Sequence, residues 1–165
     1  MQSRRLKNTS AFLRGDALTS FAFGGLRFGF SICYDLRFPE MYRKLVIEQN
    51  ANALIVSSAW PFPRVGHLRK LAMARAIENQ SYVIAASRVG ADDGVSFCGT
   101  SSIIDPGGLI VASASQDREE LIQAELSEEL VSSTRRFVLR RKQIPFLSVD
   151  GLAATIIYRP PERGS

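Results

Sequence analysis

Apolar residues recur along the first half of the chain with two alternating periods, one typical of strands and one typical of helices. Leu26–Ile32 carries large apolar side chains at every second position, which predicts a β-strand. Pro39–Gln49 has apolar residues three and four apart after a starting proline, which predicts a helix. The continuous apolar runs Ala53–Ser57 and Ser81–Ser87 predict buried strands, and Val65–Asn79 between them predicts a second helix. This order predicts an α/β fold in layers.

The pattern changes after residue 100. Ser101–Ile104 and Leu109–Ser113 flank the turn sequence DPGG at 105–108, which predicts an antiparallel hairpin and therefore a mixed sheet. Leu121–Leu126 predicts a further strand, and Ser127 is a good N-terminal cap for a last helix. We expect an extended segment from Ile144 onward.

Length and composition are those of an ordinary globular protein. The chain has 165 residues, of which 45% are hydrophobic. We expect residues 1–150 to form one domain and 151–165 a tail, with the polar end Arg159–Ser165 disordered. No apolar stretch is long enough to span a membrane, and the two cysteines have neither metal-ligand nor disulfide spacing. We therefore expect a cytoplasmic protein with no membrane partner and no metal.

The formal net charge of +5 raises the question of a nucleic-acid partner. Much of the excess lies late in the chain, at Arg135, Arg136, Arg140, Arg141 and Lys142. Basic residues also favour helix C-termini and solvated faces, and no aromatic residues are interleaved with these to stack on bases. We therefore favour a solvated face and expect no nucleic-acid binding.

The most informative residue is Cys33, which follows the strand Leu26–Ile32 directly and precedes a sharp turn. A side chain at such an elbow is held on rigid backbone, and the amides that open the turn can point at a developing negative charge. Cys33 is therefore a candidate nucleophile. A buried structural cysteine is the alternative, because free cysteines are most often buried.

Other candidate residues lie around this elbow or at neighbouring strand ends. Asp35 and Arg37 flank the elbow, and we expect them to brace the turn by hydrogen bonds rather than act on substrate. Arg75 and Glu78 are three apart on a predicted helix and can pair. Catalytic groups gather at the carboxyl ends of strands in such folds, and Ser57–Trp60 lies at one of these ends.

Several residues admit two interpretations. His67 is the sole histidine, so a Cys–His dyad with Cys33 is an alternative mechanism, although its position at a helix start argues against it. Trp60 and Phe62 could form a pocket wall or pack against a loop. Cys98, in a glycine-rich loop, is interpreted as a small filler.

With these residues in view, the chain resembles the nitrilase superfamily, the carbon–nitrogen hydrolases, and within it the small amidases that include the omega-amidases. The resemblance runs from about Phe12 to Val149 and depends on separated motifs in the expected order. They are GLRFG at 25–29, ICYDLRFPE at 32–40, SSAWP at 57–61, ARAIENQSYV at 74–83, RVG at 88–90, GTS at 99–101 and DPGG at 105–108.

This resemblance implies an α-β-β-α sandwich, of which the chain would form part, and a Glu-Lys-Cys catalytic triad without a cofactor. Cys33 matches the nucleophile, which would form a thioester with a small amide substrate. The backbone amide of Tyr34 matches one oxyanion donor. Ala59 and Trp60 match the substrate-binding region. Arg75 and Glu78 resemble a buried brace near the site.

The resemblance also leaves two catalytic groups without a counterpart. The glutamate and the lysine of the family lie upstream, and no residues here match their motifs. Lys7 is the only lysine before Cys33, and its surroundings differ from the family motif. We therefore expect a C-terminal portion of the enzyme, truncated or degenerate, that is poorly active alone.

Two functional classes follow from these observations. The first is a carbon–nitrogen hydrolase acting on a small omega-amide or related amide. The second is a non-catalytic fragment that serves as an association partner, either as a homo-oligomer or with a complementing subunit. Half of a layered sandwich would leave an apolar sheet face uncovered, which favours association.

Overall fold

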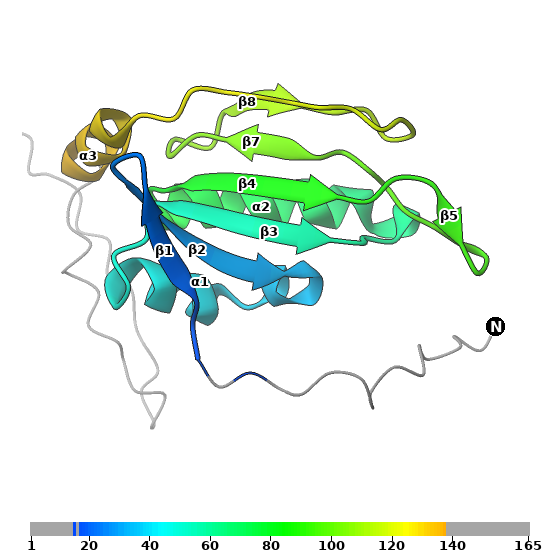
Figure 1. Ribbon diagram of the computed structural model, residues 1–165, viewed down its shortest axis with the longest axis horizontal. Helices are drawn as coiled ribbons and strands as arrows, with labels where there is room; N and C mark the ends of the chain where they lie inside the picture. The colour runs from blue at the N-terminus through cyan, green and yellow to red at the C-terminus, as the bar shows by residue number, and fades with distance from the viewer. Residues whose placement is uncertain (1–14, 16, 138–165) are drawn as a thin grey trace, which may run out of the picture.

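The computed structural model describes residue 15 and residues 17–137, and its centre is a six-stranded mixed sheet (Figure 1). The strand order is β1-β2-β3-β4-β7-β8. The strands are β1 (Ser20–Phe23), β2 (Leu26–Ile32), β3 (Ala53–Ser58), β4 (Tyr82–Ser87), β7 (Ser102–Ile104) and β8 (Ile110–Ser113), with a separate hairpin of β5 (Ala91–Asp92) and β6 (Val95–Ser96). The helices are η1 (Cys33–Arg37), α1 (Pro39–Ile47), η2 (Phe62–Arg64), α2 (Val65–Asn79) and α3 (Glu128–Phe137).

The centre of the sheet is parallel and its margins are antiparallel. Strands β2, β3 and β4 run in parallel, whereas β1, β7 and β8 pair antiparallel with their neighbours. The near-continuous apolar sequences of β3 and β4 are those expected of strands covered on both faces. The predicted α/β class and mixed sheet are therefore confirmed.

Helices α1 and α2 cover one face of the sheet and enclose the main core (Figure 1). Leu45 on α1 and Leu68 on α2 are fully buried against Leu54 and Val83 of the sheet. Burial of each such side chain contributes roughly 1.5–3 kcal/mol. Gly29 of β2 lets α1 approach, since a Cβ there would lie 3.0 Å from Leu45 Cδ2.

The predicted helices and the other predicted strands agree with the structure, with differences at their ends. The helix predicted over Pro39–Gln49 ends at Ile47. The hairpin predicted around residues 105–108 is formed by β7 and β8, and the carboxylate of Asp105 accepts hydrogen bonds from the amides of Gly107 and Leu109. Ser127 caps α3, because its Oγ accepts from the Leu130 amide at 3.2 Å.

One predicted strand is wrong. Leu121–Leu126 is extended, with Ile122 and Leu126 half-buried and Leu121 exposed, but the segment joins no ladder. Leu126 packs against Leu26 and Tyr82 on the sheet face opposite α1 and α2. The alternating pattern therefore reflects packing across a sheet face rather than pairing at a sheet edge.

The interpretation of the basic residues as a solvated face is wrong for Arg135. Its guanidinium donates hydrogen bonds to the carbonyl oxygens of Gln80 and Ala51 and to Ser81 Oγ, and so attaches α3 to the sheet. Several expectations fall outside the described residues. They concern Lys7, Arg140, Arg141, Lys142, the segment from Ile144 and the tail 151–165.

Candidate active site

Cys33 lies at the carboxyl end of β2 and is the first residue of η1. Its backbone φ is +47°, in the left-handed region that residues other than glycine seldom adopt. Such a conformation costs roughly 1–3 kcal/mol and persists only where the surrounding structure enforces it. The side chain is half-buried. A strained, partly accessible cysteine is the geometry expected of a nucleophile elbow rather than of a buried core cysteine.

Asp35 closes the turn that follows Cys33. Its Oδ2 accepts a hydrogen bond from the amide of Ile32 at 2.8 Å, and its carbonyl oxygen accepts from the amide of Phe38 at 2.9 Å. The two bonds connect the residues on either side of η1. Tyr34 lies between them in the first turn of η1, where amide groups have no acceptor inside the helix.

Arg75, on α2, holds η1 in place by hydrogen bonds. The residue is 5% exposed, and its Nε and Nη2 donate to the carbonyl oxygen of Leu36 at 3.1 and 2.8 Å. Its Nη1 donates to Glu78 Oε1 at 3.0 Å, so the buried charge is paired. The guanidinium also lies 5.5 Å from the ring centroid of Tyr42. The pair expected on the helix is therefore formed, and it connects α2 with the elbow.

A second buried contact supports β2 just before Cys33. The Tyr42 hydroxyl donates to Ser31 Oγ at 2.7 Å, and Ser31 Oγ donates to the carbonyl oxygen of Ile55 at 3.0 Å. Burial raises the pKa of Tyr42 to about 12. Sequence analysis missed this pair, because Ser31 has only the alternating polar position of a strand residue and no local signal indicates its partner.

Arg37 is stacked between two aromatic rings. Its Cζ lies 5.3 Å from the ring centroid of Tyr34 and 5.0 Å from that of Trp60, and its Nη2 lies 3.4 Å from His67 Nδ1. Within residues 15 and 17–137, Arg37 forms neither an ion pair with a carboxylate nor a hydrogen bond with the turn backbone. Its guanidinium, four residues after Cys33, therefore contacts aromatic rings and an imidazole rather than a carboxylate within this part of the chain.

Ala59 and Trp60, which follow β3, differ in their exposure to solvent. Ala59 is exposed, whereas the indole of Trp60 is buried, with Nε1 donating to the carbonyl oxygen of Arg64 at 2.8 Å. Trp60 therefore packs inside the loop and presents its ring to Arg37. Phe62 is exposed and borders a pocket beside the β5–β6 hairpin.

Within residues 15 and 17–137, Cys33 has few polar neighbours. Among the described residues, no carboxylate, ammonium or imidazole group is hydrogen-bonded to the Cys33 sulfur, and His67 contacts Arg37 instead. The second cysteine, Cys98, is fully buried, with its Sγ 3.7 Å from the carbonyl oxygen of Gly99. Cys33 is therefore the accessible thiol of the described part of the chain.

A cavity of about 810 Å³ adjoins the elbow. Its lining includes Ile32 and Asp35, which flank Cys33 on both sides, together with Phe30 and Met41.

In the part of the chain that the structure describes, no three His, Cys, Asp or Glu side chains are grouped so that they could hold a metal ion. The helices of this part are also too short or too polar to cross a membrane.

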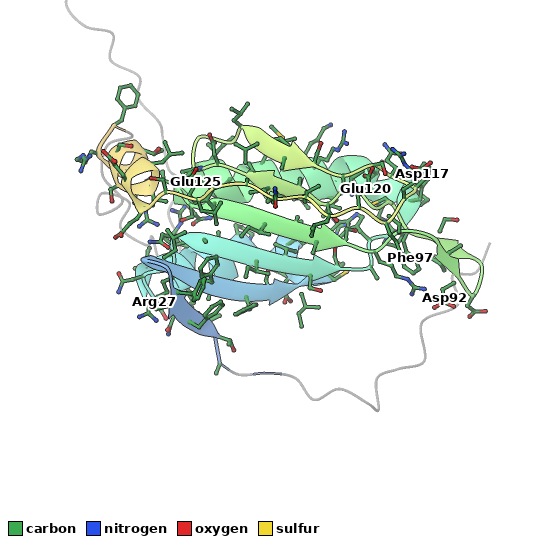
Figure 2. The ribbon with its side chains drawn as sticks, turned by 45° about the horizontal axis from the view of Figure 1, so that its top comes forward. Arg27, Asp92, Phe97, Asp117, Glu120 and Glu125 are labelled. Carbon is green, nitrogen blue, oxygen red and sulfur yellow. The ribbon has the colours of Figure 1, made fainter. Side chains whose placement is uncertain are left out.

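The ends of β4 and the β5–β6 hairpin complete this edge of the sheet. The Arg88 amide donates to the carbonyl oxygen of Ser58 at 2.9 Å, which joins the ends of β3 and β4. The Arg88 side chain pairs with Asp92 at 3.1 Å and lies 4.6 Å from the ring centroid of Phe97. Figure 2 shows Asp92 and Phe97 at the projecting end of the molecule, far from α3. Arg88 is thus occupied by a local ion pair, in contrast to Arg37.

Comparisons with known proteins identify relatives of this chain. The sequence model of the carbon-nitrogen hydrolase family matches residues 2–136. The 2-oxoglutaramate amidase of Bacillus subtilis is 38% identical over 118 residues, which cover 72% of this chain and 45% of the amidase. The chain therefore spans about half the length of this relative.

Solved structures of family members also align with this chain. Nit3 of Saccharomyces cerevisiae, a nitrilase-superfamily member, aligns with a TM-score of 0.74 and 36% identity over 82% of this chain and 50% of Nit3. An amidase from Nesterenkonia sp. AN1 was solved as a glutamate-to-glutamine variant with the acetamide moiety of fluoroacetamide added covalently at its active-site cysteine. It aligns with a TM-score of 0.61 and 28% identity over 66% of this chain and 41% of that one.

Proposed function

This chain belongs to the carbon-nitrogen hydrolase family, and we propose that it carries the nucleophile and the substrate-recognition part of an amidase site centred on Cys33. The observation that carries the proposal is the strained elbow, where a half-buried cysteine has a φ of +47° at the end of a parallel strand. Family membership supports an amide substrate, because the relatives reported above include two amidases.

The proposed reaction has two halves. In the first, the Cys33 thiolate attacks the amide carbon, a carbon–sulfur bond forms, and the carbonyl oxygen takes the negative charge. The amide of Tyr34 donates to that oxygen. The carbon–nitrogen bond then breaks, and the nitrogen leaves as ammonia after taking up the proton that the thiol gave up. In the second half, water attacks the thioester, and the carboxylic acid and the free thiol are released.

The residues around Cys33 are proposed to position it rather than to react. Asp35 accepts hydrogen bonds from the backbone on both sides of η1, and Arg75 donates hydrogen bonds to the Leu36 carbonyl oxygen. Glu78 neutralises Arg75, which otherwise would be an unpaired buried charge. Together these bonds offset the cost of the left-handed conformation at Cys33.

The substrate class proposed is an omega-amide that carries a carboxylate at its other end. The relative's substrate, 2-oxoglutaramate, is an amide of this kind. The guanidinium of Arg37 is held by Tyr34 and Trp60 without a carboxylate partner among the described residues, so it is available to bind a substrate carboxylate. Ala59, exposed at the end of β3, is proposed to border the same substrate.

Turnover by this chain alone is proposed to be slow. The thiolate is the nucleophilic form of a cysteine, and a general base normally generates it during the attack. The family resemblance implies a glutamate base and a lysine oxyanion donor, and no carboxylate or ammonium group of the described residues is hydrogen-bonded to the Cys33 sulfur. Loss of one oxyanion donor typically costs roughly 10²–10³ in rate. The acyl-transfer half of the reaction is therefore best tested with an activated substrate.

The test is acylation of the full 165-residue chain by the mono-p-nitrophenyl ester of glutaric acid, followed by intact-mass and peptide analysis. We expect one glutaryl group on Cys33, formed faster in the folded chain than in the urea-unfolded chain. Cys33→Ala should abolish the adduct, and the matched variant Cys98→Ala should retain it, because Cys98 is buried. Acylation that is equally slow in the folded and unfolded chains would contradict the proposal.

A further inference from the structure

Ser31 is a polar residue on the face of the sheet that α1 and α2 cover. Its register partner in β3, Val56, belongs to the main core, whereas its neighbours in β2, Phe30 and Ile32, are exposed on the opposite face. Ser31 itself is 4% exposed. A hydroxyl buried among apolar side chains is unfavourable unless it is hydrogen-bonded. The place of Ser31 in this core therefore depends on its hydrogen-bond partners.

The two hydrogen bonds of Ser31 have a fixed direction. Its hydroxyl donates to the carbonyl oxygen of Ile55 at 3.0 Å, and this bond uses its only proton. Its Oγ can then only accept, and it accepts from the hydroxyl of Tyr42 at 2.7 Å. Tyr42 lies on α1 and Ile55 on β3, so the two bonds join a helix and two strands. They meet β2 two residues before Cys33.

Tyr42 also contacts the support on the other side of the elbow. Its ring centroid lies 5.5 Å from Cζ of Arg75, whose guanidinium donates to the carbonyl oxygen of Leu36. Leu36 comes three residues after Cys33. Helices α1 and α2, which carry Tyr42 and Arg75, lie side by side on one face of the sheet (Figure 1). One buried phenol thus contacts the groups that hold the backbone before and after the candidate nucleophile.

The direction of the Cys33 thiol is sensitive to this support. The φ of +47° at Cys33 is a strained value that persists only where neighbouring residues enforce it. A shift at the end of β2 turns the thiol as well, because only Ile32 separates Cys33 from Ser31. A displacement of about 1 Å at a reacting group can lower a rate by roughly 10²-fold.

We propose that Tyr42 is a positioning residue for Cys33, which acts through Ser31 and Arg75 to fix the direction in which the thiol meets the substrate. The inference rests on the proposed function, in which Cys33 attacks an amide carbon. Tyr42 is fully buried, so it touches no substrate and acts only through the backbone on either side of the elbow.

An ordinary core hydrogen bond is the alternative role of the Tyr42 hydroxyl. Such a bond contributes to the stability of the whole fold, and its loss leaves the thiol of the folded chain as reactive as before. A positioning bond also affects the rate at which the folded chain reacts. The two roles are therefore distinguished by the reactivity of Cys33 under conditions in which every variant is folded.

The experiment is saturation kinetics of Cys33 acylation in the full chain by the mono-p-nitrophenyl ester of glutaric acid, followed by release of p-nitrophenolate. In Tyr42→Phe we expect the limiting rate to fall roughly 10–100-fold. The half-saturating ester concentration should not change, because Arg37, proposed to bind the ester carboxylate, is not altered. A rise in that concentration at an unchanged limiting rate would overturn the proposal.

The matched control is Gly108→Ala, in the turn after β7. This turn lies at the opposite end of the sheet from Cys33, because β7 runs antiparallel to β4 and returns to the start of that strand. A Cβ at Gly108 would lie 2.5 Å from Ile77 Cγ1, so the substitution should lower stability as Tyr42→Phe does. It should keep the original acylation rate, with circular dichroism showing that both variants are folded. An equal loss of rate in both variants would overturn the proposal.

A double-variant cycle tests whether the two hydroxyls act through one bond. Ser31→Ala should slow acylation as Tyr42→Phe does, and the double variant should be no slower than Ser31→Ala alone. Ser31→Thr, which keeps the hydroxyl, should recover most of the rate. Losses that multiply in the double variant would show that Tyr42 does not act through Ser31.

Alkylation of Cys33 by iodoacetamide separates this proposal from the proposed function. The reaction forms a carbon–sulfur bond and releases iodide, and it needs neither ester recognition nor amide chemistry. Its rate at Cys33, measured by peptide analysis, should fall severalfold in Tyr42→Phe and stay unchanged in Gly108→Ala. If the original chain is not acylated by the ester, the proposed function fails and alkylation still tests the position of the thiol. Equal alkylation rates in the original chain and Tyr42→Phe would overturn the proposal.

Discussion

The guanidinium of Arg75 donates two hydrogen bonds to the carbonyl oxygen of Leu36, from Nη2 at 2.8 Å and from Nε at 3.1 Å. This contact joins two segments 39 residues apart and places a buried positive charge under the turn that presents Cys33. It helps to hold the turn that follows the left-handed Cys33, because the Leu36 carbonyl oxygen has a fixed, charged partner. The elbow therefore depends on α2 as much as on β2.

Replacement of Arg75 should uncouple the elbow from α2. Arg75→Ala leaves the Leu36 carbonyl and Glu78 without their partner, and we expect unfolding free energy to fall by about 2–4 kcal/mol. Urea denaturation measures the loss. Arg88→Ala is the matched control, because its ion pair with Asp92 is exposed and should contribute about 0–1 kcal/mol. Equal effects of the two substitutions would show that Arg75 does not support the turn.

The buried phenol of Tyr42 predicts that the free energy of unfolding falls at alkaline pH. Burial raises its pKa to about 12, above the ordinary value of 10.0. Above pH 10 the unfolded chain loses this proton while the folded chain keeps it, so stability is full below pH 10 and falls as the pH approaches 12. The loss should reach about 2–3 kcal/mol. Urea denaturation of the original chain and of Tyr42→Phe at several pH values tests this.

The variant separates Tyr42 from other groups that titrate in the same range. Tyr42→Phe lacks the hydroxyl bond to Ser31 Oγ, so it should be less stable at neutral pH. Its stability should nevertheless fall less steeply between pH 10 and 12. Parallel pH profiles for the two proteins would argue against a buried neutral phenol.

The chain alone should release little ammonia from glutaramate-like amides. Thiol attack on an unactivated amide needs a base and charge stabilisation beyond that proposed for the Tyr34 amide. A coupled ammonia assay on the purified chain measures this, with Cys33→Ser as the control for contaminating activity. Steady release that Cys33→Ser abolishes would refute the expectation of poor activity.

Local sequence patterns predicted the elements that position the site, because those elements are dictated by near neighbours. The buried strands β3 and β4 are continuous apolar runs, and the Cys33 elbow lies between one strand and a helix that starts with Pro39. The hairpin of β1 and β2 was missed, although Gly24 and Gly25, both with positive φ, supply the turn that favours it.

Long-range features could not be predicted in the same way. The stacking of Arg37 on Trp60 joins the elbow to the loop after β3, and its geometry follows from tertiary packing alone. The alternation of Leu121–Leu126 is that of a strand, but its partner is a sheet face rather than a sheet edge. Periodicity identifies which side chains are buried and not what buries them.

The turn between β7 and β8 gives a last prediction, which concerns the packing of α2. Gly108 has a φ of +92°, and a Cβ there would lie 2.5 Å from Ile77 Cγ1. Gly108→Ala should therefore lower the unfolding free energy by about 1–3 kcal/mol, through both backbone strain and overpacking. In the double variant with Ile77→Ala, the part of this loss of unfolding free energy that comes from overpacking should be recovered. Gly66→Ala is the matched control, because Gly66 lies in α2 with nothing within 4 Å, and there the substitution should stabilise by up to about 1 kcal/mol. Urea denaturation of these three variants tests the prediction, and a stabilising Gly108→Ala would contradict the close approach of this turn to α2.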